Sequence, residues 1–175
     1  MTHEVNTSES YILREISRAG GFYGIFGKEL IKAVQPCMDR ALRCVERSRR
    51  IMQELGLDEI CRKCDEEEGG SCCGKGIENY YGMSLLLANL MAAVELPKKR
   101  YDPGGCFFLV PGGCSLVFRH TICVNYLCRK IYDELGSDSI VKLQEISGHE
   151  INAVFELNER ILAFLRFRNH GSADL

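Results

Sequence analysis

The sequence lacks a charge excess of either sign, and it lacks any long apolar run. Its 22 Lys and Arg residues nearly balance 24 Asp and Glu residues, which gives a formal net charge of −2. That balance provides no overall electrostatic basis for binding nucleic acid or an anionic membrane. No apolar run approaches the roughly 20 residues that a bilayer-spanning helix needs, and the polar N-terminus has no apolar signal-peptide core. We therefore expect a cytoplasmic protein, with no membrane or nucleic-acid partner indicated and a protein partner left open.

Known catalytic signatures are also missing. The sequence contains no G-x-S-x-G, no H-E-x-x-H, no phosphate-binding P-loop and no dinucleotide-binding glycine motif. The spacing of its residues suggests no Ser/His/Asp arrangement. The sequence therefore assigns no catalytic residue, and whether the protein is an enzyme stays open.

What the sequence does contain is enough apolar material for one core and two long helical patterns. At 175 residues and 46% hydrophobic content, residues 1–175 are expected to form a single domain. Apolar side chains recur every three or four residues over 28–56 and again over 139–168. We expect these two helices to pack against each other, antiparallel, and to scaffold the segment between them. The predicted fold class is mainly α with a small β-hairpin.

Shorter elements follow from local signals. Gly20-Gly21 is expected to end a first short helix, and Ser84 and Pro97 to begin and stop a later one. Two apolar runs that flank Pro111-Gly112-Gly113 indicate a hairpin. The predicted short elements are helices over 10–19, 85–95 and 121–135, an extended stretch over 77–83, and hairpin strands over 106–110 and 114–118.

Eight of the 10 cysteines lie in one segment, residues 61–128, which we call the cysteine-rich module. Cysteine is otherwise among the most buried residue types, yet the first four stand in the polar, glycine-rich stretch C-R-K-C-D-E-E-E-G-G-S-C-C-G-K-G. Disulfides or a metal would explain such a cluster, and thiols stay reduced in the cytoplasm, which favours a metal. The eight candidate ligands are Cys61, Cys64, Cys72, Cys73, Cys106, Cys114, Cys123 and Cys128.

The spacing of these cysteines constrains how they bind. Cys61-x-x-Cys64 is typical of a ligand knuckle, a turn that directs two sulfurs at one ion; a redox pair would need a βαβ setting that is absent here. The adjacent Cys72 and Cys73 cannot easily point the same way. We expect one of them to face a metal and the other to bind a second centre or to pack.

The choice of metal stays open. Zinc and iron–sulfur clusters both accept four thiolates. A zinc ribbon would show a second C-x-x-C, which is absent, so scattered ligands suit an iron–sulfur cluster, 4Fe-4S if so, at least as well. We expect one or two sites, with Cys61, Cys64, Cys106 and Cys123 among the ligands.

The cysteine order resembles that of the YkgJ-type proteins, a family described as zinc- or iron-chelating domains. The family pattern runs C-x-x-C, then C-C, then C-x-F-L, then C-x-Y-x-x-R-P-x-x-C, and the resemblance covers residues 61–128. Three positions depart from it: Leu116 stands for Tyr, His120 for Pro and Val124 for Arg. The matching positions are Cys61, Cys64, Cys72, Cys73, Cys106, Phe108-Leu109, Cys114, Arg119 and Cys123. Similar domains occur in flagellin lysine methylases, which implies an enzymatic branch.

Three further residue types have competing interpretations. Arg119 falls between two expected ligands, where a guanidinium would offset thiolate charge from the second coordination shell. His120 could ligate, but the module already has thiols in excess. Cys37 and Cys44 share one face of the first long helix and are expected to be core thiols. The sequence thus favours a thiolate metal-binding protein, with an iron–sulfur redox or sensor protein and a relative of protein lysine methylases as alternatives.

Overall fold

The computed structural model describes residues 5–68 and 72–170. Within them the chain is mainly helical with one two-stranded antiparallel hairpin, which confirms the predicted fold class. None of the described helices combines the length and the apolar character needed to cross a bilayer. The elements are α1 (Val5–Glu54), α2 (Leu57–Glu68), the 3-10 helix η1 (Ile77–Tyr80), α3 (Met83–Met91), β1 (Leu109–Val110), β2 (Gly113–Cys114), α4 (Thr121–Asn125), α5 (Arg129–Glu134) and α6 (Ser137–His170).

Helix α1 is one continuous helix of 50 residues. The glycine-rich stretch expected to separate helices over 10–19 and 28–56 is itself helical, so both of those boundaries were wrong. Each glycine costs roughly 1 kcal/mol relative to alanine inside a helix. Ile12 and Leu30, on either side of the stretch, are fully buried in the core, and this tertiary packing outweighs the local preference.

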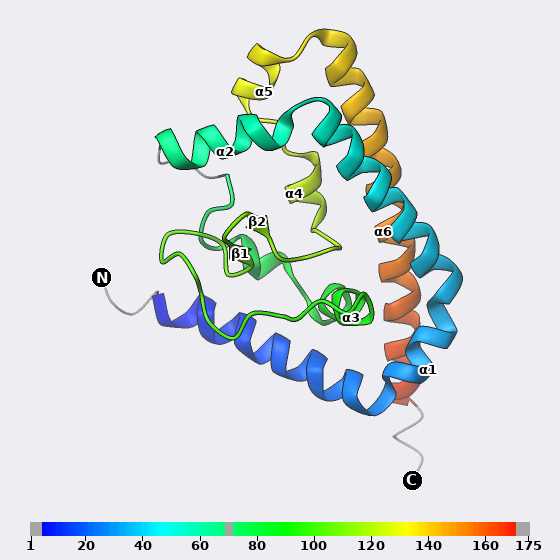
Figure 1. Ribbon diagram of the computed structural model, residues 1–175. Coiled ribbons are helices and arrows are strands. Elements are labelled where there is room, and N and C mark those ends of the chain that lie inside the picture. Colours follow the sequence, from blue (N-terminus) through cyan, green and yellow to red (C-terminus); the bar gives the residue numbers. More distant parts are fainter. Residues whose placement is uncertain (1–4, 69–71, 171–175) are drawn as a thin grey trace.

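The long helix is not straight. Its direction changes between the dark-blue and light-blue parts of the ribbon (Figure 1). Pro36 lies inside α1, where a missing N–H and a bulky ring weaken the helical hydrogen-bond ladder. A Cβ at Gly27 would lie 2.9 Å from ring atoms of Tyr23, so a larger residue there would force that ring to move. The bend lets the first half of α1 pass along the cysteine-rich module while the second half packs on α6.

Helices α1 and α6 pack antiparallel, as expected. Arg40 Nη1 lies 2.7 Å from Glu156 Oε2, and Lys142 Nζ lies 3.8 Å from Glu54 Oε2. In antiparallel helices the residue number rises on one helix as it falls on the other, and the two pairs share the same sum of residue numbers. They therefore belong to one register, which sets which turns of α1 and α6 face each other. The predicted apolar stripe of α1 is buried between them and includes Val34, Met38, Ala41, Val45 and Ser48.

Several predictions for the middle of the chain need correction. The helix expected over 85–95, with Ser84 as its cap and Pro97 as its stop, instead begins at Met83 after an extended Gly82 and ends at Met91. The stretch 77–83, expected to be extended, opens with the 3-10 helix η1. The single helix expected over 121–135 is split into α4 and α5, because Leu127 and Ile131 pack in a separate apolar cluster beside α2. The predicted hairpin is confirmed, but its strands are shorter than the expected 106–110 and 114–118, since they span only Leu109–Val110 and Gly113–Cys114.

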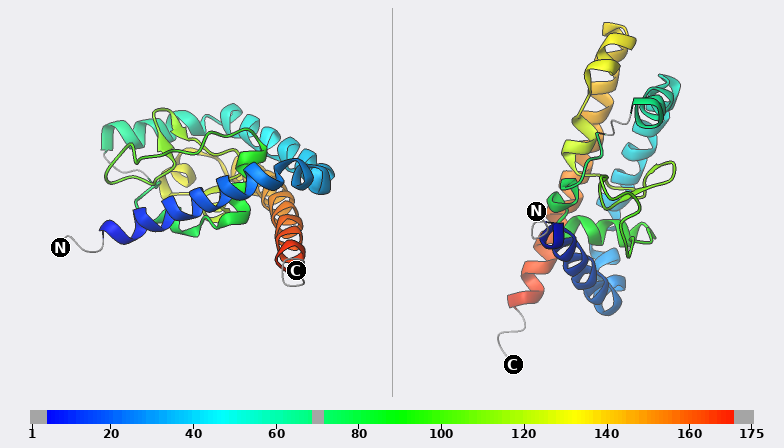
Figure 2. Two further views of the ribbon diagram at one scale, coloured as in Figure 1. Left: turned by 90° about the horizontal axis from the view of Figure 1, so that it is seen from below. Right: turned by 90° about the vertical axis from the view of Figure 1, so that its left-hand side faces the viewer.

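The middle of the chain lies between the first half of α1 and helix α2. Figure 1 and the right-hand view of Figure 2 both place α3, the hairpin and the loops around it there. Asn89 fastens this layer to α3: its Nδ2 donates to the carbonyls of Leu85 and Phe118, and its Oδ1 accepts from the N–H groups of Val117 and Phe118. A fully buried amide with every hydrogen bond made holds the loop before α4 in one position.

Candidate functional site

The first two cysteines of the module lie on helix α2 rather than in a turn. We expected a knuckle at Cys61 and Cys64, but α2 is helical from Leu57 to Glu68. Gly56, with a left-handed φ of 71°, makes the corner between α1 and α2. Residues three apart lie on one side of a helix, so the two thiols share a side of α2.

Three further cysteines, Cys128, Cys72 and Cys73, come close to this pair. Cys128 caps the start of α5 with an extended backbone, and α5 packs on α2 through Ile131 and Leu57. Burial raises the pKa of the Cys61 thiol, and negative charge at Cys128, Asp58, Cys64 and Cys73 raises it further. A hydrogen bond with Cys73, and then burial, raise the pKa of Cys72, and thiolates at Cys61 and Cys128 add to that shift.

The other three cysteines, together with Cys73, lie in the loop cluster around the hairpin and α4. The N–H of Cys106 donates to the carbonyl of Cys73 at 2.7 Å, and Gly74 pairs with Gly105 in an antiparallel bridge. Cys114 stands opposite Leu109 in the hairpin. Backbone pairing therefore positions Cys73 and Cys106 side by side and brings the hairpin's cysteine to the same loop cluster.

Cys123 completes this second group from the first turn of α4. Its Sγ lies 3.7 Å from the hydroxyl of Tyr81, which also accepts a hydrogen bond from the N–H of His120 at 2.9 Å. Burial raises the pKa of Cys123, and the hydrogen bond from Tyr81 partly offsets that rise. Tyr81 is itself buried, so a single ring ties α4 to the segment that follows η1.

Charge repulsion links the members of the second group. Burial raises the pKa of Cys106 to about 12, and charge at Glu78, Cys114 and Cys73 contributes to that rise. Burial also raises the pKa of Cys114, with further contributions from Cys73 and Cys123. Each thiolate thus disfavours the ionisation of its neighbouring thiols. A cation among them would remove that repulsion, because a metal-bound thiol is deprotonated outright.

The cysteines are gathered but do not form a closed ligand set. Among the described residues, no group of three or more His, Cys, Asp or Glu side chains is close enough to hold a metal ion. None of the 10 cysteines, all within the described part, forms a disulfide. Cys61, Cys72 and Cys114 are exposed, and only Cys106 is buried. Metal binding would therefore require the thiols to turn toward one another.

Arg119 lies beside the second thiol group and contacts a buried carboxylate. Its positive charge lowers the pKa of both Cys114 and Cys123, against the effect of their burial. Its Nη2 lies 3.7 Å from Glu150 Oε1 and 3.9 Å from the sulfur of Met52. The guanidinium is thus placed between the thiols and α6, which is where a second-shell cation would stand.

A second buried ion pair holds the backbone around Cys73 and Cys106. Glu78 is fully buried, and its Oε1 lies 2.5 Å from Arg100 Nη2. Its Oε2 accepts from the N–H groups of Gly76 and Phe107, and Arg100 also donates to the carbonyl of Gly105. Burial alone would raise the pKa of Glu78, but these hydrogen bonds bring it below its ordinary value.

His120, Cys37 and Cys44 make ordinary capping and packing contacts. His120 caps α4 by accepting from the N–H of Ile122, and its ring stacks on Tyr80. Burial lowers the pKa of His120. Cys37 and Cys44 pack against the core as expected. Among the residues described, neither His120 nor either of these cysteines belongs to a group of three or more His, Cys, Asp or Glu side chains that could hold a metal ion.

Sequence reasoning missed Tyr81, Glu78 and Glu150. The clearest available signal concerned Glu150, a carboxylate seven residues before the buried Leu157 and hence on the buried side of α6. No pattern in the sequence pairs Glu78 with Arg100 or Tyr81 with Cys123. Comparison of the chain with protein-family models, curated proteins and solved structures gave no match. The resemblance of residues 61–128 to YkgJ-type domains therefore stays a prediction.

Proposed function

We propose that the protein binds metal through cysteine thiolates, at two neighbouring four-cysteine sites, in the reducing cytoplasm. The first site would use Cys61, Cys64, Cys72 and Cys128, and the second would use Cys73, Cys106, Cys114 and Cys123. The observation that carries this proposal is the position of the adjacent Cys72 and Cys73. The first is repelled by charge at Cys61 and Cys128, and the second pairs with the backbone of Cys106.

This division gives every module cysteine a role. Cys72 and Cys73 lie in a bend, and their thiols are hydrogen-bonded to each other, so two centres that share this short segment would lie close together. It revises the expectation that Cys61, Cys64, Cys106 and Cys123 converge, since the first two lie on α2 and the last two come from the loop cluster around the hairpin and α4. When bound, zinc or an iron–sulfur cluster would supply positive charge that stabilises the thiolates, and an iron–sulfur cluster would also supply redox chemistry.

Metal analysis of anaerobically purified protein tests the proposal. We expect two zinc ions per chain in a colourless protein, or two iron–sulfur clusters with acid-labile sulfide in a brown one. The brown outcome would favour a redox or sensor role. A metal-free protein, purified under reducing conditions and unable to take up zinc or iron, would contradict metal binding altogether.

Single cysteine variants separate two sites from one. Cys61→Ser should remove about half of the metal, and Cys106→Ser the other half, with a lower melting temperature in each case because metal binding contributes to folding. Cys37→Ser is the matched control, a thiol on α1 outside the module. Loss of all metal in either module variant would indicate a single shared site, and retention in both would exclude these ligands.

A relationship to protein lysine methylation remains the alternative that the family resemblance implies. It would require a site for a methyl donor and a peptide lysine in addition to the metal centres. A methyl-transfer assay on the metal-loaded protein with a lysine-containing peptide would test it.

A further inference from the structure

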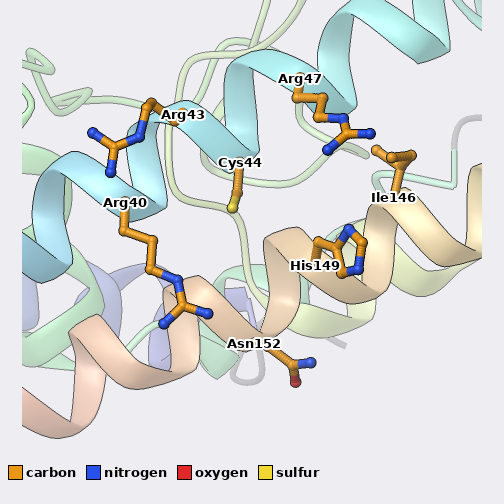
Figure 3. A pocket seen from close by; sticks show the side chains of 7 residues that line it. All are labelled: Arg40, Arg43, Cys44, Arg47, Ile146, His149 and Asn152. Carbon is orange, nitrogen blue, oxygen red and sulfur yellow. The ribbon is translucent and has the colours of Figure 1, made fainter.

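A hollow on the outer side of the α1–α6 pair lies away from the cysteine-rich module. Its volume is about 250 Å³, and Arg40, Arg43, Cys44, Arg47, Ile146, His149 and Asn152 line it. The lining residues come from facing turns: α1 contributes residues at spacings of three and four, and α6 contributes residues at spacings of three. Figure 3 shows Arg40 and Arg47 reaching from α1 on either side of Cys44, with His149 and Asn152 on α6 below.

The charge of this hollow is positive, although the whole chain carries −2. Three of its lining residues are arginines, and no lining residue is acidic. Arg40 is neutralised by Glu156, at 2.7 Å. Among the described residues, no ion pair compensates Arg43 or Arg47, and both are exposed. Figure 3 shows Arg47 above the His149 imidazole and Arg43 extending from α1 on the other side of Cys44, so the positive charge around the hollow favours an anion.

We propose that this hollow binds the phosphate group of a small molecule. The planar guanidinium fork of arginine fits phosphate oxygens, and charge-assisted hydrogen bonds of this kind are roughly twice as strong as neutral ones. Phosphate carries a charge of about −1.5 to −2 at neutral pH, which balances Arg43 and Arg47. His149 and Asn152 supply further polar contacts from α6.

The size and lining of the hollow indicate the rest of the ligand. Its volume falls below the roughly 300 Å³ at which pockets for drug-sized ligands begin, so inorganic phosphate or a short phosphate monoester fits best. No Phe, Tyr or Trp residue lines it, so it lacks the large aromatic rings on which nucleobases commonly stack. These features favour a small phosphate over a polynucleotide. The proposal does not depend on metal binding.

Cys44 provides a built-in reporter, because its thiol lies on the floor of the hollow. Alkylation by neutral iodoacetamide, measured residue by residue by mass spectrometry, should slow at Cys44 as inorganic phosphate or a simple alkyl phosphate monoester is added. Cys37 is half-buried on the same helix and outside the lining, so its rate should not change. Chloride at equal ionic strength controls for screening.

Charge variants assign the effect to the arginines. Arg43→Gln and Arg47→Gln should each weaken phosphate binding by about tenfold, the equivalent of one lost charge-assisted contact. Both side chains are exposed, so the fold should survive, which circular dichroism checks. Arg14→Gln removes the same charge from an exposed position of α1 outside the hollow and should have no effect.

Three outcomes would overturn the proposal. If chloride slowed the alkylation of Cys44 as much as phosphate does, the protection would be due to ionic screening and not to phosphate binding. Unchanged phosphate binding in both arginine variants would place the anion elsewhere. Protection by a single-stranded oligonucleotide, with none from either phosphate probe, would make the hollow part of a nucleic-acid surface instead. Protection by the monoester alone would support the proposal and identify an organic phosphate as the ligand.

Discussion

The guanidinium of Arg119 and the carboxylate of Glu150 form a buried pair with a separation of 3.7 Å. Glu150 is fully buried on α6, and neither of its oxygens accepts a hydrogen bond from a described residue. Arg119 is mostly buried, and its charge acts on Cys114 and Cys123 from the other side. The pair thus connects the helical scaffold to the proposed second metal site.

Removal of the guanidinium should weaken that site. We expect Arg119→Ala to lower metal retention by on the order of tenfold, the low end for outer-shell residues. Arg119→Lys should restore only part of it, because a point charge does not replace the planar fork. Competition with a chelator measures the change. Equal retention in the wild-type, Ala and Lys proteins would remove Arg119 from the metal site and favour a substrate-binding role for it.

Arg119 and Glu150 should also be coupled in stability. Removing either charge leaves the other buried without its partner, so each single alanine variant should lose about 3 kcal/mol. The double variant should lose less than the sum of the two by about 1 kcal/mol or more. Urea unfolding of all four proteins in the metal-free state gives this coupling. Additive losses would show that the two groups do not interact.

The Glu78–Arg100 pair should govern stability in acid. Glu78→Gln should destabilise the fold by about 3 kcal/mol, since it leaves a buried guanidinium unpaired. The folded-state pKa of Glu78 lies below its ordinary value of 4.5. Its stabilising effect is therefore complete above that pH and is lost as the pH falls through the folded-state value. The difference in free energy of unfolding between the wild-type and variant proteins, measured from pH 7 down to pH 3, should narrow as the pH falls. A constant gap would contradict this assignment.

Tyr81→Phe should change the chemistry of Cys123 without removing a cysteine. The hydroxyl hydrogen-bonds to Cys123 and lowers the pKa of that thiol. Its loss should raise the pKa and slow alkylation of Cys123 in the metal-free protein, while Cys37 reacts as before. Loss of the bond from the N–H of His120 should cost about 1–3 kcal/mol, because a buried donor is left unsatisfied. Unchanged alkylation of Cys123 would show that the contact has no electrostatic effect.

Local pattern in the sequence determined the fold class and the main elements. The three- and four-residue spacing of Val34, Met38, Ala41 and Val45 predicted a buried helical stripe, and these residues are buried. Two apolar runs around Pro111-Gly112-Gly113 predicted the hairpin. Such signals are local, because a helix or a tight turn is decided by neighbours along the chain.

Only the tertiary structure decided the continuity of α1 and the division of the module cysteines. Glycines and Pro36 predict breaks in isolation, but packing against α6 and α3 keeps α1 helical to Glu54. Cys72 and Cys73 are adjacent cysteines, and no local pattern in the sequence assigns them different roles. In the structure Cys73 pairs with the backbone of Cys106, 33 positions later, and Cys72 is hydrogen-bonded to Cys73 and lies near the thiols of Cys61 and Cys128. Contacts between residues far apart in the chain depend on how the helices pack, and no short-range pattern encodes them.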